Sequence, residues 1–275
     1  MPRHASALSR LTRRAALAAV FCVTELSLQA AEFQPGIAFV TSTQGSLQST
    51  GAPADLASYA LHTSYELSGQ SIRTGDAAGL CFALSNGVGI SIGADSQVQF
   101  EQFQQLPFSS ERASLELEPS RSQLAIRLSA GSLALACPGS SPSSVTTVST
   151  PHGTVRIHSG HCRITYSDEQ TRICTYSGNL SFSFAQAQTR AYLPQSTQAI
   201  ITRESAQTGR MAQQIPVSEL PANFHQLAAA AKNARQRVYF TLADAATRPL
   251  AIQIVAPEYY EQSSARPYTY REQLP

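Results

Sequence analysis

Apolar and polar residues alternate with a period of two through most of this chain, from Gly36 to about Thr202. Successive side chains of a β-strand point to opposite faces, so this period is typical of strands with one buried face. Turn-forming residues interrupt the pattern at short intervals, and no stretch of the region has helical periodicity. The pattern therefore predicts a mainly β domain.

The clearest predicted element is a hairpin between residues 80 and 92. Its strands are joined by the three-residue loop Ser85-Asn86-Gly87, and Gly87 occupies the loop position that favours a left-handed backbone. This loop places all the large apolar side chains of the hairpin on one face. The predicted pairs are Leu84 with Val88, Phe82 with Ile90, and Leu80 with Ile92.

A second hairpin is predicted from Gly160 to Phe184, with two registers left open. A turn centred on Asp168 places Cys162 opposite Cys174, where a closely spaced non-hydrogen-bonded pair can form a disulfide. A two-residue turn at Asp168-Glu169 shifts the register by one and turns the two cysteines to opposite sides. If Cys162 and Cys174 are bridged, the other disulfide of the chain joins Cys81 to Cys137.

The periodicity changes after Pro216. Apolar residues then recur at three- and four-residue spacing, and Pro221 suits the first turn of a helix. We expect an amphipathic helix within residues 217–245, followed by a flexible tail at 246–275 that contains several Tyr and Pro residues. The apolar positions of the helix are Leu220, Phe224, Leu227, Ala231, Ala234 and Val238.

The N-terminus has the order of a secretory signal peptide. An Arg-rich segment at 1–14 precedes an apolar run at 15–28, and the small residues Ala30 and Ala31 follow. The uninterrupted apolar stretch is much shorter than the ~20 residues that span a bilayer. We expect cleavage after Ala30, no stable membrane span afterwards, and a periplasmic or extracellular location, with a retained anchor as the alternative. The four cysteines that follow are an even number, which in an exported chain favours disulfides.

Charge and motifs exclude several classes of function. Residues 1–30 hold four of the 20 basic and one of the 18 acidic side chains, so the remainder is nearly neutral and has no basic stripe for nucleic acid. His152, His158, His161 and Cys162 suggest a metal site, but His158 and His161 have opposite parity along a strand. We expect turn and edge histidines, with no catalytic residue, metal or cofactor; a metal-dependent hydrolase is the minor alternative.

Four segments resemble the FecR-like domain, in family order. Residues 71–100 begin with the family's Ile-x-Thr-Gly step and continue through a strand, an Asn-Gly turn and a second strand. Leu128–Leu133 is similar to its Leu-x-x-Gly-x-Leu step and Ser149–Ile157 to its Thr-Pro-x-x-x-Val step, before a closing Gly178-Asn179-Leu180. The resemblance runs from about Val40 to Thr202.

The resemblance implies a fold, a location and a set of partners. The fold is an elongated, twisted two-sheet domain of solenoid-like or jelly-roll-like character at residues 31–216, usually exported and without catalytic residues. The better-known members are transmembrane sigma-factor regulators, whose cytoplasmic anti-sigma domain has no counterpart in this sequence. We therefore expect an exported, non-enzymatic module that binds an envelope protein or glycan. The alternative is a periplasmic signalling module that reports to a separate sigma or anti-sigma regulator.

Overall fold

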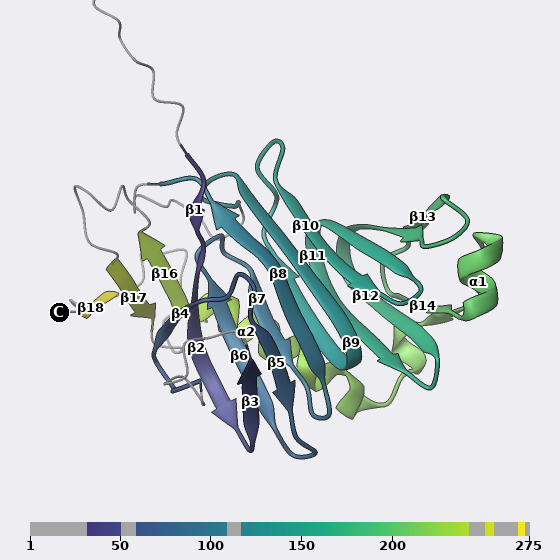
Figure 1. The fold of residues 1–275 in the computed structure, drawn as a ribbon, viewed down its shortest axis with the longest axis horizontal. Helices are drawn as coiled ribbons and strands as arrows, with labels where there is room; N and C mark the ends of the chain where they lie inside the picture. The colour runs from purple at the N-terminus through teal and green to yellow at the C-terminus, as the bar shows by residue number, and fades with distance from the viewer. Residues whose placement is uncertain (1–31, 51–58, 109–116, 242–250, 256–268, 273–275) are drawn as a thin grey trace, which may run out of the picture. The chain divides into compact units, whose positions relative to one another are not determined.

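The computed structural model describes residues 32–50, 59–108, 117–241, 251–255 and 269–272. The described residues form one open, mixed 15-stranded sheet, a smaller three-stranded sheet and a C-terminal helix (Figure 1). Of the described residues, 57% lie in strands and 12% in helices, so the predicted mainly β fold with a C-terminal helix is confirmed. The signal peptide predicted at 1–30 lies outside the described residues.

The strands and helices have the following bounds. The first half of the large sheet contains β1 Gln34–Pro35, β2 Ile37–Gln44, β3 Leu47–Thr50, β4 Ser64–Glu66, β5 Ser71–Thr74, β6 Gly79–Leu84, β7 Gly89–Ile92 and β8 Gln97–Gln105. The second half contains β9 Ser122–Cys137, β10 Val145–Thr150, β11 Gly153–Ser167, β12 Gln170–Phe184, β13 Arg190–Leu193, β14 Thr197–Ile201 and β15 Gln213–Pro216. The helices are α1 Arg203–Thr208, the 3-10 turns η1 Val217–Glu219 and η2 Ala222–His225, and α2 Gln226–Arg237. The small sheet contains β16 Val238–Thr241, β17 Ala251–Val255 and β18 Thr269–Glu272.

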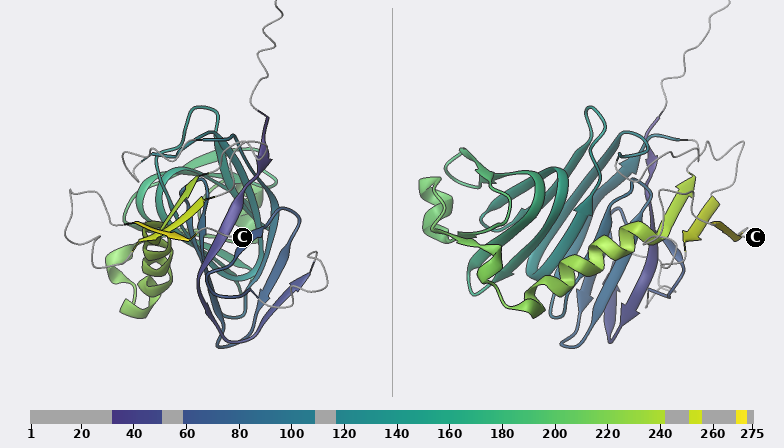
Figure 2. Two further views of the ribbon diagram at one scale, coloured as in Figure 1. Left: turned by 90° about the vertical axis from the view of Figure 1, so that its left-hand side faces the viewer. Right: turned by 180° about the vertical axis from the view of Figure 1, so that it is seen from behind.

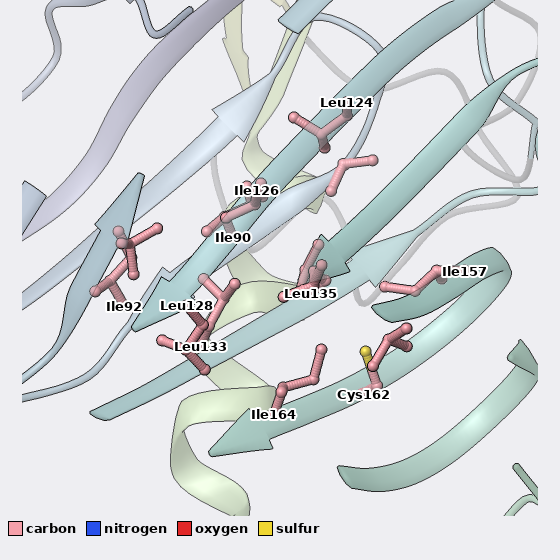
Figure 3. Close-up of a cluster of buried hydrophobic side chains, with 14 of the residues drawn as sticks. Ile90, Ile92, Leu124, Ile126, Leu128, Leu133, Leu135, Ile157, Cys162 and Ile164 are labelled. Atoms are coloured by element: carbon pink, nitrogen blue, oxygen red, sulfur yellow. The ribbon is translucent and has the colours of Figure 1, made fainter. Parts of the chain in front are cut away.

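The β6–β7 hairpin has the predicted register. Leu80 pairs with Ile92 and Phe82 with Ile90, while the Leu84 amide donates to the Val88 carbonyl over 2.8 Å. Gly87 has a φ of 85°, the left-handed conformation expected of this loop position. The six large apolar side chains of this hairpin are all buried in the main core. Figure 3 shows Ile90 and Ile92 beside Ile126 and the leucines of β9.

Three long strands each change their inward parity close to a glycine. In β9 the buried side chains occupy even positions up to Leu128 and odd positions from Leu133, on either side of Gly131. In β11 the change lies close to Gly160, at the register shift between Ile157 and Ser159, and in β12 close to Gly178, opposite the register shift between His161 and Cys162. Both halves of each strand therefore face one core. The halves of β9 have different neighbours, since residues 122–130 pair with β8 and residues 133–136 with β7.

Gly160 and Gly178 lie directly opposite each other on β11 and β12. Their φ angles are 111° and 98°, which L side chains rarely adopt. A Cβ on Gly160 would lie 2.1 Å from the Ser177 carbonyl oxygen, and a Cβ on Gly178 would lie 2.1 Å from that of Ser159. The bend therefore needs glycine on both strands, because the neighbouring backbones occupy the space of any side chain.

The second hairpin has the alternative register. Ser167 pairs with Gln170 across the two-residue turn Asp168-Glu169, so Cys174 lies opposite Arg163 and Cys162 opposite Thr175. Asp168 and Glu169 both have positive φ, at 51° and 55°, which is the geometry of a tight hairpin turn. The prediction that Cys162 lies opposite Cys174 is therefore wrong.

The predicted disulfides are not formed in this structure. Cys137, Cys162 and Cys174 are buried free thiols, and since Cys137 is free, the predicted Cys81–Cys137 bridge is also missing. Cys162 points into the core, as Figure 3 shows. Cys174 lies on the other side of the sheet, where Gln198 Nε2 donates to Cys174 Sγ over 3.2 Å. The two sulfurs therefore lie on opposite faces of the sheet and cannot form a disulfide.

The predicted C-terminal helix is present but shorter than the expected segment 217–245. Two 3-10 turns precede α2, and the chain continues from Arg237 directly into β16. Pro221 precedes η2, in keeping with its expected place at the helix start. Within residues 246–275, for which the sequence predicts a flexible tail, the structure describes strands β17 and β18.

Candidate functional site

The large sheet has two different outer faces, which we define by the residues that point away from the core. The helix-covered face contains outward residues of β7, β9, β11 and β12 beneath α2. The right-hand view of Figure 2 shows α2 crossing these strands, and Figure 1 shows the sheet from the other side. The residues of the helix-covered face are Gly89, Ser91, Ala134, Ala136, His161, Arg163, Cys174 and Tyr176.

Small side chains allow α2 to approach the helix-covered face closely. Ala134 and Ala136 of β9 form a buried cluster with Ala228 and Ala231 of α2. At Gly89 the two backbones come so near that an added Cβ would lie 2.0 Å from the Ala231 carbonyl oxygen. Of the helix positions that the sequence predicts to be apolar, Ala231 therefore faces the sheet, together with Ala228, which the predicted stripe did not include.

Sheet side chains also form hydrogen bonds to main-chain carbonyls of α2 and of the preceding turn η2. The Arg163 guanidinium donates through Nη1 to the Phe224 carbonyl over 2.6 Å and lies over the Phe224 ring, 3.8 Å from its centroid. His161 Nε2 lies 2.5 Å from the Ala228 carbonyl oxygen, and so carries the proton of that hydrogen bond. In the other direction, Arg235 Nε of α2 donates to the Gly87 carbonyl over 3.0 Å.

Burial disfavours charge on the groups beneath α2. It lowers the pKa of His161, despite the hydrogen bond to Ala228 that raises it, and lowers the pKa of Arg163. Burial also raises the pKa of Tyr176 to about 12. The Tyr176 ring packs between the imidazoles of His161 and His225, at centroid distances of 5.0 and 5.6 Å. The environment beneath α2 therefore favours the neutral form of the His161 imidazole.

The histidines and the cysteine that the sequence groups together are separated in space. His161 lies under α2, whereas Cys162 points into the core on the opposite side of the same strand. His152 is buried with its Nδ1 3.0 Å from the Thr171 hydroxyl, and His158 is exposed. Among the described residues, no three His, Cys, Asp or Glu side chains form a group that could hold a metal ion.

The open face is the outward side of β8, the first half of β9, β10, the first half of β11, the second half of β12, and β13. Strand pairing aligns its side chains in two rows that cross six strands. All of them are exposed or half-exposed. The first row is Gln102, Ala125, Thr147, Arg156, Ser181 and Tyr192; the second is Gln99, Arg127, Ser149, Thr154, Ser183 and Arg190.

The open face is polar and weakly cationic. Arg127 forms an ion pair with Glu101, an exposed neighbour on β8, and donates from Nε to it over 2.7 Å. Arg190 donates from Nε to the Ser183 hydroxyl over 3.3 Å. Tyr192 is the one large apolar side chain of the two rows and is 56% exposed. The sequence alone did not predict this surface, although the Gln, Ser and Thr residues that recur at outward positions of the strands are its signal.

Comparison with known proteins identifies the domain. The model of the family described as FecR protein matches residues 70–181, a segment that begins one residue before β5 and ends within β12. The chain therefore carries a FecR domain, and the predicted resemblance is confirmed. The matched segment contributes to both outer faces of the sheet.

Solved structures give a more distant likeness. Two crystal structures of a candidate anti-sigma factor from Parabacteroides distasonis share 12% and 11% identity with this chain, each with a TM-score of 0.37. Each alignment covers 53% of this chain and 59% of the solved chain, so this chain spans less than two thirds of those proteins. No curated protein matches significantly. In the described part of the chain, none of the helices has the length and apolar character that crossing a membrane requires.

Proposed function

We propose that this chain is a non-enzymatic regulatory module of the cell envelope, in which the FecR domain binds an envelope ligand and the bound state affects a signalling pathway. The observation that carries the proposal is the FecR match at residues 70–181, which includes strands of both outer faces but ends before β13 of the open face. The family resemblance implies regulators of sigma-factor activity rather than enzymes. A role in signalling is therefore the function that the domain supports best.

The two outer faces of the sheet support different roles within such a module. The helix-covered face is occupied by a segment of the same chain, through an alanine interface and hydrogen bonds from His161 and Arg163. The open face offers a broad polar surface of six strands. We assign ligand binding to the open face and a structural role to the helix-covered face.

The location supports the same proposal. Residues 1–30 have the order of a signal peptide, and the known FecR-like regulators place this domain outside the cytoplasm. We therefore place the mature chain in the periplasm or at the cell surface. Fractionation of cells that express the tagged full chain, with intact-mass measurement of the envelope form, tests this placement; a full-length form in the cytoplasm would contradict it.

Transcript measurement in the host organism tests the regulatory role. We expect deletion of this chain to change the transcripts of a sigma-factor-dependent set of genes, and the wild-type chain supplied in trans to restore them. Unchanged transcripts across conditions that stress the envelope would contradict regulation. That result, together with a change in envelope composition or mechanical strength, would favour the second candidate, a purely structural binding module, for which the broad open face is the supporting observation.

A further inference from the structure

The open face has the chemistry of a surface for an extended acidic polymer, and its two rows define where that polymer lies. Six neighbouring strands spaced ~4.8 Å apart give each row a length of about 24 Å. The surface is therefore long enough for an oligosaccharide rather than a single sugar. Its side chains belong to regular strands of one sheet, so their spacing is fixed before a ligand binds.

The charged groups of the open face favour an anion. Arg156 occupies the middle of the first row and Arg190 the end of the second, while the carboxylate of Glu101 is already paired with Arg127. Within the described part of the chain, the Arg156 guanidinium has neither an ion pair nor a hydrogen bond. A guanidinium binds a carboxylate through two parallel hydrogen bonds, so Arg156 and Arg190 provide two points for carboxylate groups.

The remaining side chains favour a sugar polymer over a protein. Protein interfaces depend on buried aromatic and apolar anchors near their centre, and the rows offer Tyr192 alone, at the edge of the sheet. Hydroxyl and amide groups fill most of the other positions in the two rows, including Thr147, Ser149 and Gln99. These groups both donate and accept hydrogen bonds, as sugar hydroxyls do, and an exposed tyrosine ring has an apolar face against which a pyranose ring can pack.

Nucleic acid fits the open face less well. Binding to a phosphate backbone relies on many neutralised phosphates, and single strands add several stacking aromatics. The two rows contain three arginines, one of them paired, and a single aromatic ring. We therefore propose that the open face binds an extended, carboxylate-bearing polysaccharide, with Arg156 and Arg190 contacting its carboxylates and Tyr192 packing against a sugar ring. This inference rests on the proposed binding role and names its ligand class.

Titration of the purified protein with oligogalacturonate tests the inference, with a neutral cello-oligosaccharide of the same length and poly-glutamate as comparison probes. The test variant is R156Q/R190Q. The control variant is R203Q/R210Q, which removes two exposed arginines of α1 and the turn after it and so changes the net charge equally. We expect the wild-type protein to bind oligogalacturonate, R156Q/R190Q to bind at least about tenfold more weakly, and the control to remain within about twofold of the wild type.

Three results would overturn the inference. The first is no binding of oligogalacturonate by the wild-type protein, and the second is equal weakening in R156Q/R190Q and R203Q/R210Q. The third is binding of poly-glutamate or of the neutral oligosaccharide as tight as that of oligogalacturonate. Circular dichroism and thermal unfolding of both variants ensure that lost binding is not lost folding. If the protein does not bind oligogalacturonate but the deletion strain still shows its transcript change, the ligand class is wrong and the regulatory role stands. If the protein binds oligogalacturonate but the deletion leaves the transcripts unchanged, the regulatory role is wrong and the ligand class stands.

Discussion

Substitution of Gly89 by alanine should separate α2 from the sheet. The added Cβ would lie 2.0 Å from the Ala231 carbonyl oxygen and 2.7 Å from the Arg235 amide nitrogen. Both atoms belong to the helix backbone, so no side-chain rotation relieves the overlap. The helix must move outward, which stretches the hydrogen bonds from His161 to Ala228 and from Arg235 to Gly87.

The size of the effect follows from this overlap. Overpacking a well-packed contact costs about 1–3 kcal/mol. Alanine is otherwise more favourable than glycine in a strand, by roughly 0.5–1 kcal/mol. Gly79 of β6 is the matched control, because a Cβ there has its nearest neighbour at 3.8 Å, the Ile92 carbonyl oxygen, and its φ is not in the left-handed region. We therefore expect Gly89→Ala to be about 2 kcal/mol less stable than Gly79→Ala, or ~4–8 °C lower in Tm for a chain of this size.

Denaturant unfolding and amide hydrogen exchange measure the two parts of this prediction. Unfolding gives the difference in stability between Gly89→Ala and Gly79→Ala. Exchange should be faster in Gln226–Arg237 of Gly89→Ala, while amides of the β6–β7 hairpin outside the substituted position keep their protection. If Gly89→Ala is as stable as Gly79→Ala and α2 keeps its protection, the close packing of helix and sheet is refuted.

Three further outcomes test other parts of the structure. Gly160→Ala should destabilise the protein by several times the ~1–2 kcal/mol expected for Gly69→Ala. Both residues have positive φ, but only at Gly160 would the added Cβ overlap a neighbouring backbone atom. Equal losses of unfolding free energy in denaturant would refute the bend. Because burial lowers the pKa of His161, the unfolded chain binds a proton more readily, so stability should fall as pH drops below ~6.5, and less steeply in His161→Gln; identical pH profiles of the free energy of unfolding would contradict this. Burial raises the pKa of Cys137 to about 12 and raises the pKa of Cys162 well above its ordinary value, so neither thiol should be alkylated at pH 8 while the protein is folded. Unfolding without reductant should make both thiols reactive, and mass spectrometry showing them bridged would contradict the free thiols.

Local patterns predict only those elements whose geometry depends on adjacent residues. The β6–β7 hairpin follows from apolar alternation and from Gly87, both of which lie within the hairpin itself. The Cys162–Cys174 pairing fails because Asp168 and Glu169 form a tight two-residue turn, in which Glu169 occupies a position where glycine is strongly preferred. The choice between the two registers was open in the sequence and is decided by the packing of the whole sheet.

The outer faces were harder to predict for a related reason. A change of parity close to Gly160 and Gly178 means that residues of equal parity in one strand do not share a face along its whole length. The position of Tyr176 beneath α2, and of Ser181 on the open face, follows only once these bends are known. Small outward residues such as Gly89 are the sequence signal for the docked helix, and they can be interpreted only when the strand register is fixed.

The most direct test of the account is the transcript profile of a host strain whose own copy of this chain carries R156Q/R190Q. The account predicts that this strain reproduces the transcript change of the deletion strain while a strain carrying R203Q/R210Q resembles the wild type, with equal amounts of protein in the envelope of both. A deletion strain with changed transcripts beside an R156Q/R190Q strain with wild-type transcripts would contradict the claim that the open face is the ligand-binding surface of a regulatory FecR module.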